Sequence, residues 1–477
     1  MKKVLLLFIV SLIAFAPVFA AGTAGKPKDV ELTVYNQNFA LVKEQREMTL
    51  TQGINYVSVL DVASQIEPTS VAFKSLTDPE GVVVREQNYQ YDLVSPDTIL
   101  NKSIGKKVKI RRIVEGRVVE QDGVLLSSAQ NGRVIQTATG ILLDPSGEIE
   151  VQELPGGLVS TPTLMWKLEA DKAGAHNTQV SYLTNGMGWM ADYVAVVDPL
   201  DKFVDITGWV TLNNGSGATY ENASLNLMAG DVRRIQPQYK DYEGGFGGLE
   251  MARVAAAPQF EEKSFFEYHL YTLQGKTTVR DKETKQITLM TAAQVPAKKI
   301  YIYDGRKQWW WSYRYGNYRP GESYDVSANK KVNVLVEIAN TRENNLGIPL
   351  PKGRVRVYKQ EAGANQHFVG EDEIDHTPKD EKIRLYLGDA FDIVGEHTRA
   401  NFRRISNIEV EESFEISLRN HKDAPVTITV VEHLFGDWRI LQSSHKYEKK
   451  DASTAEFLVE VPKDGEVKVT YTARTKW

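Results

Sequence analysis

Most of this chain alternates apolar and polar residues in short stretches, a pattern with a period of two. The stretches are rich in Val, Ile, Thr and Tyr and are bounded by Gly, Asn and Asp, as in VELTVY (30–35), FVDITGWVTL (203–212) and VTITVVEHL (426–434). Because successive side chains of a strand point to opposite faces of a sheet, this pattern is typical of antiparallel strands with one buried face. We therefore expect an all-β protein built from several β-sandwich (immunoglobulin-like) units.

Turn spacing and composition divide the chain into regions. Strands are short and turns tight between residues 96 and 155, which favours a small SH3-like β-barrel inserted between larger units. Only 61–68 and 97–104 have the pattern of short helices. The expected regions are a signal peptide (1–20), an N-terminal β domain (25–95), the SH3-like unit (96–155), a first part of a β-sandwich (164–235), an insertion with Gly/Ala-rich and Trp/Tyr-rich loops (236–329) and a second part of the sandwich (330–477).

A faint internal repeat links the two parts of the sandwich. The stretches VTLNNGSGATYENASLNLMAGDVRRI (210–235) and ISLRNHKDAPVTITVVEHLFGDWRI (416–440) both run strand, Asn, polar turn, strand and Gly-Asp. Two related sandwich units explain this order of features, and chance similarity is the alternative.

The N-terminus has the three parts of a secretory signal. Lys2 and Lys3 precede an apolar stretch over 4–18, and the small residues Val18 and Ala20 occupy the −3 and −1 positions of a cleavage site. We expect cleavage after Ala20 and export to the periplasm or the extracellular space. Later apolar stretches are shorter than the roughly 18 residues that a span needs, so no transmembrane span is expected in the mature chain.

Charge and cysteine content exclude several classes of protein. The formal charge is −5, and it becomes −7 once Lys2 and Lys3 leave with the signal, so the chain has no nucleic-acid signature. The chain contains no cysteine, which excludes disulfides, zinc–thiolate sites and thiol catalysis. An exported protein of this kind must be held together by packing alone.

The most unusual stretch is KQWWWSYRYGNYRP (307–320). Three consecutive Trp rings cannot share one face of a strand, so at least one faces away from a one-sided core. Flat rings beside Arg donors suit sugar rings, stacked bases or a membrane interface, whereas a hairpin folded over its own domain uses them for cation–π packing. Export and acidity disfavour nucleic acid. The candidate ligand-binding residues are Trp309, Trp310, Trp311, Tyr313, Arg314 and Tyr315.

Other polar clusters carry weaker signals. GEDEIDHTPKDE (370–381) holds six acidic residues and His376, but it lacks the order of an EF-hand loop and has lysines nearby, which favours a solvated hairpin tip over a cation site. Glu432-His433 and Glu396-His397 are adjacent pairs, and on strands such neighbours point to opposite faces. The chain has no HExxH, GxSxG, Walker or strand-linked GxGxxG motif. We assign no catalytic residue, no metal ligand and no cofactor.

Several long strings together resemble the bacterial domain-of-unknown-function 4139 family, a domain also found in mucoidy inhibitor A-like proteins. They are VYNQNFALVKEQREMTLTQGINYV (34–57), SYLTNGMGWMADYVAVVD (181–198), LNNGSGATYENASLNLMAGDVRR (212–234), GRVRVYKQ (353–360), FVGEDEIDHTPKDEKIRLYLGDAFDI (368–393) and NHKDAPVTITVVEHLFGDWRI (420–440). The resemblance implies an exported, β-rich envelope protein with no assigned reaction. Unlike the mucoidy-inhibitor type, this chain has the small β unit over 96–155 in place of a helical coiled-coil segment.

These observations together predict an exported, non-catalytic β-rich protein with a binding or structural role in the bacterial cell envelope. Its expected partner is an envelope protein or a glycan, not a nucleic acid. The alternative is a hydrolase acting on envelope glycan or peptide, with its acidic groups assembled from distant strands.

Overall fold

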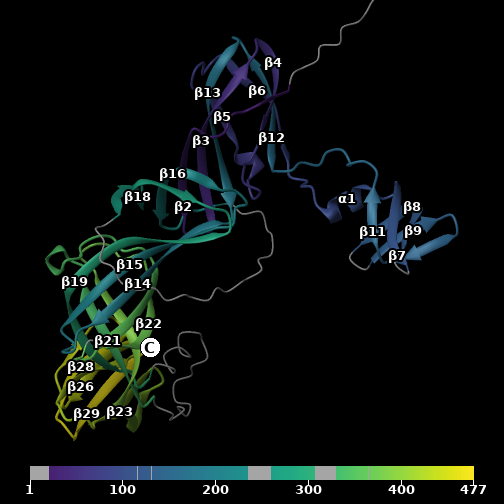
Figure 1. Ribbon diagram of the computed structural model, residues 1–477. Helices are drawn as coiled ribbons and strands as arrows, with labels where there is room; N and C mark the ends of the chain where they lie inside the picture. Colours follow the sequence, from purple (N-terminus) through teal and green to yellow (C-terminus); the bar gives the residue numbers. More distant parts are fainter. Residues whose placement is uncertain (1–20, 115–116, 130–131, 235–258, 307–328, 364) are drawn as a thin grey trace, which may run out of the picture. The chain divides into compact units, whose positions relative to one another are not determined.

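The computed structural model describes residues 21–114, 117–129, 132–234, 259–306, 329–363 and 365–477 (Figure 1). These residues form 29 strands, one α-helix and two short 3-10 helices, η1 (Pro68–Ser70) and η2 (Arg342–Asn344), so the predicted all-β fold is confirmed. Within the same residues, no helix has the length and apolar character needed to cross a membrane.

The described residues fall into two compact units. The first contains those up to Trp189, together with Leu212–Met228 and Thr272–Lys285. The second contains those of Met190–Thr211, Ala229–Tyr271 and Gln286–Trp477. Each unit therefore combines segments that are distant in sequence.

The first unit contains a sandwich of two sheets. One has the order β1-β4-β12-β6, with strands β1 (Ala21–Thr23), β4 (Gly53–Val59), β12 (Thr163–Ala170) and β6 (Val82–Gln90). The other has the order β18-β16-β2-β3-β13-β5, with strands β18 (Tyr268–Val279), β16 (Tyr220–Ala229), β2 (Asp29–Tyr35), β3 (Phe39–Leu50), β13 (Gly174–Asn185) and β5 (Ala72–Ser75). The rings of Phe73 on β5 and Trp166 on β12 meet edge to face with centroids 5.1 Å apart, so the two sheets share a core.

Residues 96–151 form a small separate sheet with its own core. Its order is β10-β9-β8-β7-β11, with strands β10 (Gly140–Leu143), β9 (Gly132–Thr137), β8 (Arg117–Ala129), β7 (Lys107–Val114) and β11 (Glu148–Val151). Val108, Ile110, Leu125 and Ile135 pack together on its inner face.

The two short helices expected from the sequence have different outcomes. Helix α1 (Pro96–Lys102) forms close to the helix predicted over 97–104. It starts there because the Ser95 hydroxyl accepts a hydrogen bond from the Thr98 N–H and Pro96 occupies the first turn. The helix expected over 61–68 was wrong. Ile66 in that stretch instead bridges to Thr184 as an isolated β pair.

The second unit contains most of a 13-stranded sheet. Along its path lie β22 (Gln366–Ile374), β21 (Gly353–Gln360), β14 (Met187–Val197), β15 (Phe203–Asn214), β19 (Glu283–Tyr303), β20 (Lys331–Ala339), β23 (Lys382–Ser406), β24 (Glu409–Asn420), β29 (Gly465–Lys476) and β26 (Asp437–Ser443). Strand β22 also lies against β23, since the Tyr386 N–H donates to the Asp372 carboxylate at 2.7 Å. A hairpin strand, β17 (Phe260–Phe265), pairs with β18.

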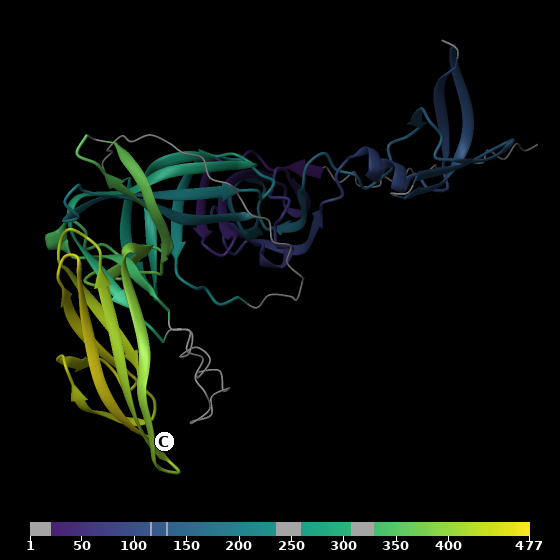
Figure 2. The ribbon, with the colours of Figure 1, turned by 90° about the horizontal axis from the view of Figure 1, so that it is seen from below.

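The C-terminal strands of this unit form a sandwich, the green to yellow part of Figures 1 and 2. Strands β25 (Val426–His433), β28 (Thr454–Val461) and β27 (Tyr447–Lys449) pair with one another, and β25 also pairs with the end of β19. Their inward residues share one core with those of β20, β23, β24 and β29. Gly395 on β23 is required there, because a Cβ atom at this position would lie 2.1 Å from the buried ring of Tyr303.

The internal repeat seen in the sequence has a structural counterpart at two buried asparagines. Asn214 donates through Nδ2 to the carbonyls of Ala218, Val279 and Arg280, and its Oδ1 accepts from the Ser216 N–H. In the other unit, Asn420 has the matching set of partners: Ala424, Val461, Pro462 and the Lys422 N–H. Each side chain thus joins its own turn to the end of a strand far along the chain.

Removal of this amide from the second unit is expected to be costly. The Asn420→Ala substitution leaves buried carbonyls without a donor, so we expect a loss of about 2 to 4 kcal/mol in the free energy of unfolding. Calorimetric unfolding of the mature chain measures the change. The exposed Asn407 supplies the control substitution Asn407→Ala, and equal effects of the two would contradict this role for Asn420.

Candidate functional site

Three titratable side chains meet inside the core of the C-terminal sandwich. His397 Nε2 lies 3.1 Å from Glu432 Oε2, and the Tyr471 hydroxyl donates to the same oxygen at 2.5 Å. The exposed fractions are 8% for His397, 0% for Glu432 and 2% for Tyr471. We call this set the Glu432 network, and it contains the acidic, basic and hydroxyl groups that a catalytic site uses.

The strand pattern explains why these polar groups lie in the core. Each stands on the inward face of its strand: His397 on β23, Glu432 on β25 and Tyr471 on β29. Glu432 continues the inward row of Ile428 and Val430, which are fully buried. The period of two therefore places a carboxylate where the pattern otherwise places an aliphatic side chain.

A second polar pair lies beside this network. His433 Nε2 is 2.9 Å from Asp304 Oδ2, and Arg306 donates to the His433 carbonyl at 3.4 Å. The Arg306 guanidinium also lies over the Phe414 ring, 5.0 Å from its centroid. As expected, the side chains of the neighbours Glu432 and His433 point apart: Glu432 bonds to His397 on β23, and His433 bonds to Asp304, which directly follows β19.

Burial and charge act on Glu432 in opposite directions. Burial alone would raise the pKa of the carboxyl group, but the charge and hydrogen bond of His397, with Arg306 and Tyr471, hold that pKa below its usual value. Burial, together with the Glu432 charge, raises the pKa of Tyr471 far above its usual value. The second carboxylate oxygen, Glu432 Oε1, is buried and makes no hydrogen bond to any of the residues described in this structure.

This arrangement does not suit catalysis by these three groups. An activated nucleophile requires a lowered pKa and access to a substrate, whereas the Tyr471 hydroxyl is buried and its pKa is raised. The Glu432 network instead ties β23, β25 and β29 together by side-chain bonds. Its chemistry is that of a buried, charge-assisted anchor.

The six candidate binding residues of the aromatic run lie outside the described residues. The structure does describe the residues on either side of the segment 307–328 that contains them. The Asn329 N–H donates to the Gly305 carbonyl at 3.2 Å, and the buried Tyr303 hydroxyl donates to the Asn329 carbonyl at 2.8 Å. Gly305 and Asn329, which flank the segment, therefore lie side by side on the sandwich.

The acidic stretch 370–381 is spread along β22 and the turn that follows. Glu371 lies 3.7 Å from Arg356, and Lys352 lies within 3.6 Å of both Glu373 and Asp375. Within the described part of the chain, no group of three His, Cys, Asp or Glu side chains is arranged to hold a metal ion. Basic side chains from β21 and its entry thus pair with three of the six carboxylates.

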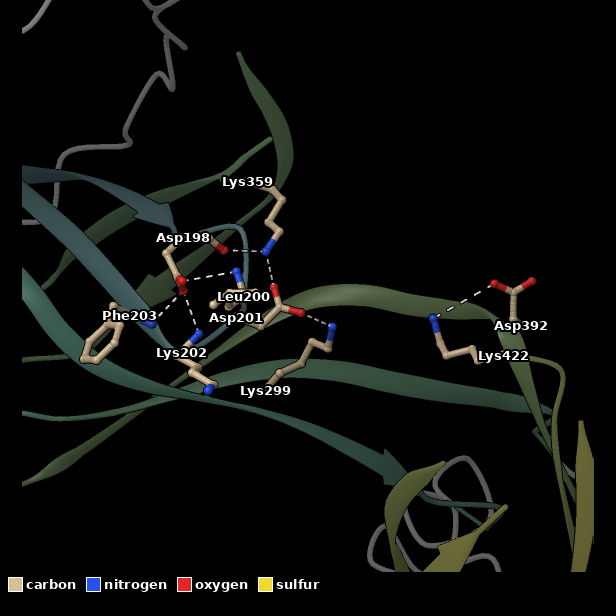
Figure 3. A network of polar contacts seen from close by, with 9 residues as sticks. All are labelled: Asp198, Leu200, Asp201, Lys202, Phe203, Lys299, Lys359, Asp392 and Lys422. Carbon is tan, nitrogen blue, oxygen red and sulfur yellow. Dashed lines mark hydrogen bonds and ion pairs between the residues drawn. The ribbon is translucent and has the colours of Figure 1, made fainter. Parts of the chain in front are cut away.

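A turn network that sequence reasoning missed joins β14 and β15 (Figure 3). The Asp198 carboxylate accepts from the backbone N–H groups of Leu200, Lys202 and Phe203. Lys299 and Lys359 both bind the Asp201 carboxylate, so β19 and β21 are tied to the same turn. Burial would raise the pKa of Asp201, but the two lysines hold it below its usual value. These lysines lie 98 and 158 residues from Asp201 in the chain, which explains why no local motif revealed them.

We expect the Glu432→Gln substitution to reduce the free energy of unfolding at neutral pH by about 2 to 4 kcal/mol, because it removes the buried carboxylate to which His397 and the Tyr471 hydroxyl are hydrogen bonded. The folded pKa of Glu432 is lowered, so its contribution is complete above the unfolded pKa of about 4.3 and is lost as the pH falls through the folded value. The difference in the free energy of unfolding between wild type and variant should therefore become smaller at acidic pH. Thermal unfolding of both proteins, measured between about pH 3 and pH 7, tests both statements.

The matched control is Glu396→Gln on the same sandwich. Glu396 is 42% exposed and pairs with Arg419 at 3.1 Å, so the loss should stay below about 1 kcal/mol. An equal effect of the two substitutions would contradict the buried anchor.

Comparison with known proteins adds no family to this description. No family model matches the chain, and no curated protein matches it significantly.

Proposed function

We propose that this protein is exported to the bacterial cell envelope and acts there by binding or as a structural component, without catalysing a reaction. In this proposal the aromatic run supplies the contact surface for an envelope protein or a glycan, through Trp309, Trp310, Trp311, Tyr313, Arg314 and Tyr315. The strings that resemble the domain-of-unknown-function 4139 family support an envelope role, since that resemblance implies exported, β-rich proteins.

The observation that carries the proposal is the closed base of the segment 307–328. Gly305 and Asn329 are hydrogen bonded to each other, and Tyr303 holds Asn329 from inside the core. Gly305 also packs closely on His397, since a Cβ atom at Gly305 would lie 2.7 Å from the His397 Cβ. A segment with both ends fixed on one sandwich can change in sequence without altering the strands that hold it.

The Glu432 network supports a non-catalytic role. The acid, base and hydroxyl that come together in the C-terminal sandwich are all buried, and they hold strands together. Binding therefore accounts for the unusual aromatic content better than chemistry at this cluster does.

Export is tested first. When the full chain is expressed in a bacterial host, the mature protein should start at Ala21 and appear outside the cytoplasm, as shown by mass spectrometry of cell fractions. Ala20→Arg should block cleavage because the −1 position requires a small residue. Ala21→Ser is the control and should be processed normally. A cytoplasmic protein that retains residues 1–20 would contradict export.

Binding by the aromatic run is tested separately with the mature protein. Wild type should be retained on insoluble envelope polysaccharides such as peptidoglycan, and the variant with Trp309, Trp310 and Trp311 all changed to Ala should not. The melting temperature of this variant should stay within about 3 °C of wild type, because the packed core remains intact. The exposed Tyr91, in the Tyr91→Ala variant, gives the control for general loss of aromatic surface.

Two results would count against this function. A collapse in stability of the Trp variant would place the rings in the core. Release of reducing ends from the polysaccharide, abolished by one Asp or Glu substitution, would favour a hydrolase instead.

A further inference from the structure

One face of the hairpin formed by β21 and β22 carries a row of charged and aromatic side chains. Strand β21 places two valines, Val355 and Val357, in the core. Arg354, Arg356 and Tyr358 occupy the alternate positions, so all three share the face that points away from these valines. The outer face of this strand is therefore built from two guanidinium groups and a ring.

Strand β22 adds a second ring and a carboxylate to the same face. Phe368 pairs with Tyr358, and their rings meet edge to face with centroids 5.7 Å apart. Glu371 pairs with Arg356, and a bulge between the two pairs keeps Phe368 and Glu371 on one face. Since Phe368 is 56% exposed, its ring forms an open platform next to the charged positions.

A nearly buried carboxylate lies on the other side of the arginines. Asp192 on β14 is in register with Arg354 and is 9% exposed. The Thr211 hydroxyl on β15 donates to Asp192 Oδ2 at 2.7 Å, which fixes the carboxylate. The other oxygen, Asp192 Oδ1, lies 3.8 Å from Arg354 Nε and 3.9 Å from Arg356 Nη1. Four neighbouring strands, β22, β21, β14 and β15, thus contribute to one surface (Figure 1).

The charged groups of this surface approach one another without forming hydrogen bonds. Arg356 Nε lies 3.7 Å from Glu371 Oε2, and this distance, like both distances to Asp192 Oδ1, exceeds the about 2.7 to 3.2 Å of a hydrogen bond. The guanidinium groups of Arg354 and Arg356 make no hydrogen bond to any residue that the structure describes. Contacts of this length suit a third group that accepts from the arginine and donates to the carboxylate. A hydroxyl group does both.

The charges around the hairpin disfavour an ionic ligand. Its ion pairs join three cations to four carboxylates: Lys352, Arg354, Arg356, Asp192, Glu371, Glu373 and Asp375. No excess of positive charge is therefore present here to attract a phosphate or an acidic polymer. Each of these carboxylates already has a basic group within 3.8 Å. The ligand that fits has no net charge, several hydroxyl groups and an apolar side for the aromatic ring.

We propose that this face binds a ring of a neutral sugar. The C–H side of a pyranose ring packs on Phe368, as apolar surface does on an aromatic ring. Its hydroxyl groups accept from Arg356 and donate to Glu371 or to Asp192 Oδ1. The contact is weak, because an open face covers only one side of the ligand. This surface is separate from the aromatic run and does not depend on it.

The test is calorimetric titration of the full mature chain with three soluble oligosaccharides: cellotetraose, maltotetraose and the tetramer of N-acetylglucosamine. At least one of them should bind to wild type. Phe368→Ala should weaken this binding about tenfold because it removes the platform, and Arg356→Ala should weaken it by a similar factor. Both variants should melt within about 3 °C of wild type, since Phe368 is exposed and Arg356 has no hydrogen bond to a described residue to lose.

Two controls separate this face from other aromatic surface. Tyr91→Ala removes a ring that is 70% exposed in the other unit, and it should leave the affinity unchanged. The variant with Trp309, Trp310 and Trp311 changed to Ala should also bind these oligosaccharides as wild type does. Contact as weak as this is measured at equilibrium and does not retain protein on a washed insoluble polysaccharide, so the two assays report on different surfaces.

Three results would overturn the sugar-binding face. The first is the absence of binding to all three neutral oligosaccharides. The second is unchanged binding by both hairpin variants, or an equal loss in either control. The third is tighter binding of tetragalacturonate, which carries a carboxylate on each ring, than of the neutral oligosaccharides, because that would show a site for anions.

Discussion

Alternate side chains of most long strands are buried, and the register that keeps them buried is the constraint on which the rest of this structure depends. A shift of one residue in β24, whose inward row includes Phe414, Ile416 and Leu418, would move that row to the solvent. The chain has no cysteine, so no disulfide limits such a shift. The register must therefore be held by packing and by specific polar contacts.

Buried polar side chains supply many of those contacts. Asn214 and Asn420 each satisfy carbonyls at a turn and at the end of a distant strand, and each can do so in one register only. The Glu432 network ties three strands in the same way. Removal of such a group leaves its partners buried and unsatisfied, which makes these positions specific as well as stabilising.

Some large apolar side chains remain exposed. Phe265 and Phe266 stand exposed on the strained turn between β17 and β18, where Phe266 has φ of 57°, whereas the acid and base of the Glu432 network are enclosed. Under the proposed function, exposed aromatic rings are the groups available for contact, because the acid and base of the Glu432 network are enclosed.

The sequence by itself determined the all-β class, because a period of two is a local pattern that matches the alternation of side chains between the two faces of a strand. It also located helix α1 through Ser95 and Pro96, and it hinted at the repeat around Asn214 and Asn420. The failed helix over 61–68 shows where local propensity loses to a tertiary contact, the bridge between Ile66 and Thr184.

Only the tertiary structure decided which polar residues meet. Glu432 was visible beside His433 in the sequence, yet its partners His397 and Tyr471 lie 35 and 39 residues away. Strand pairing brings such residues together, and neither the period nor the composition encodes which strands pair. The left-handed backbone of Phe266 was equally hidden, because a turn's torsion angles follow from the strands that it joins.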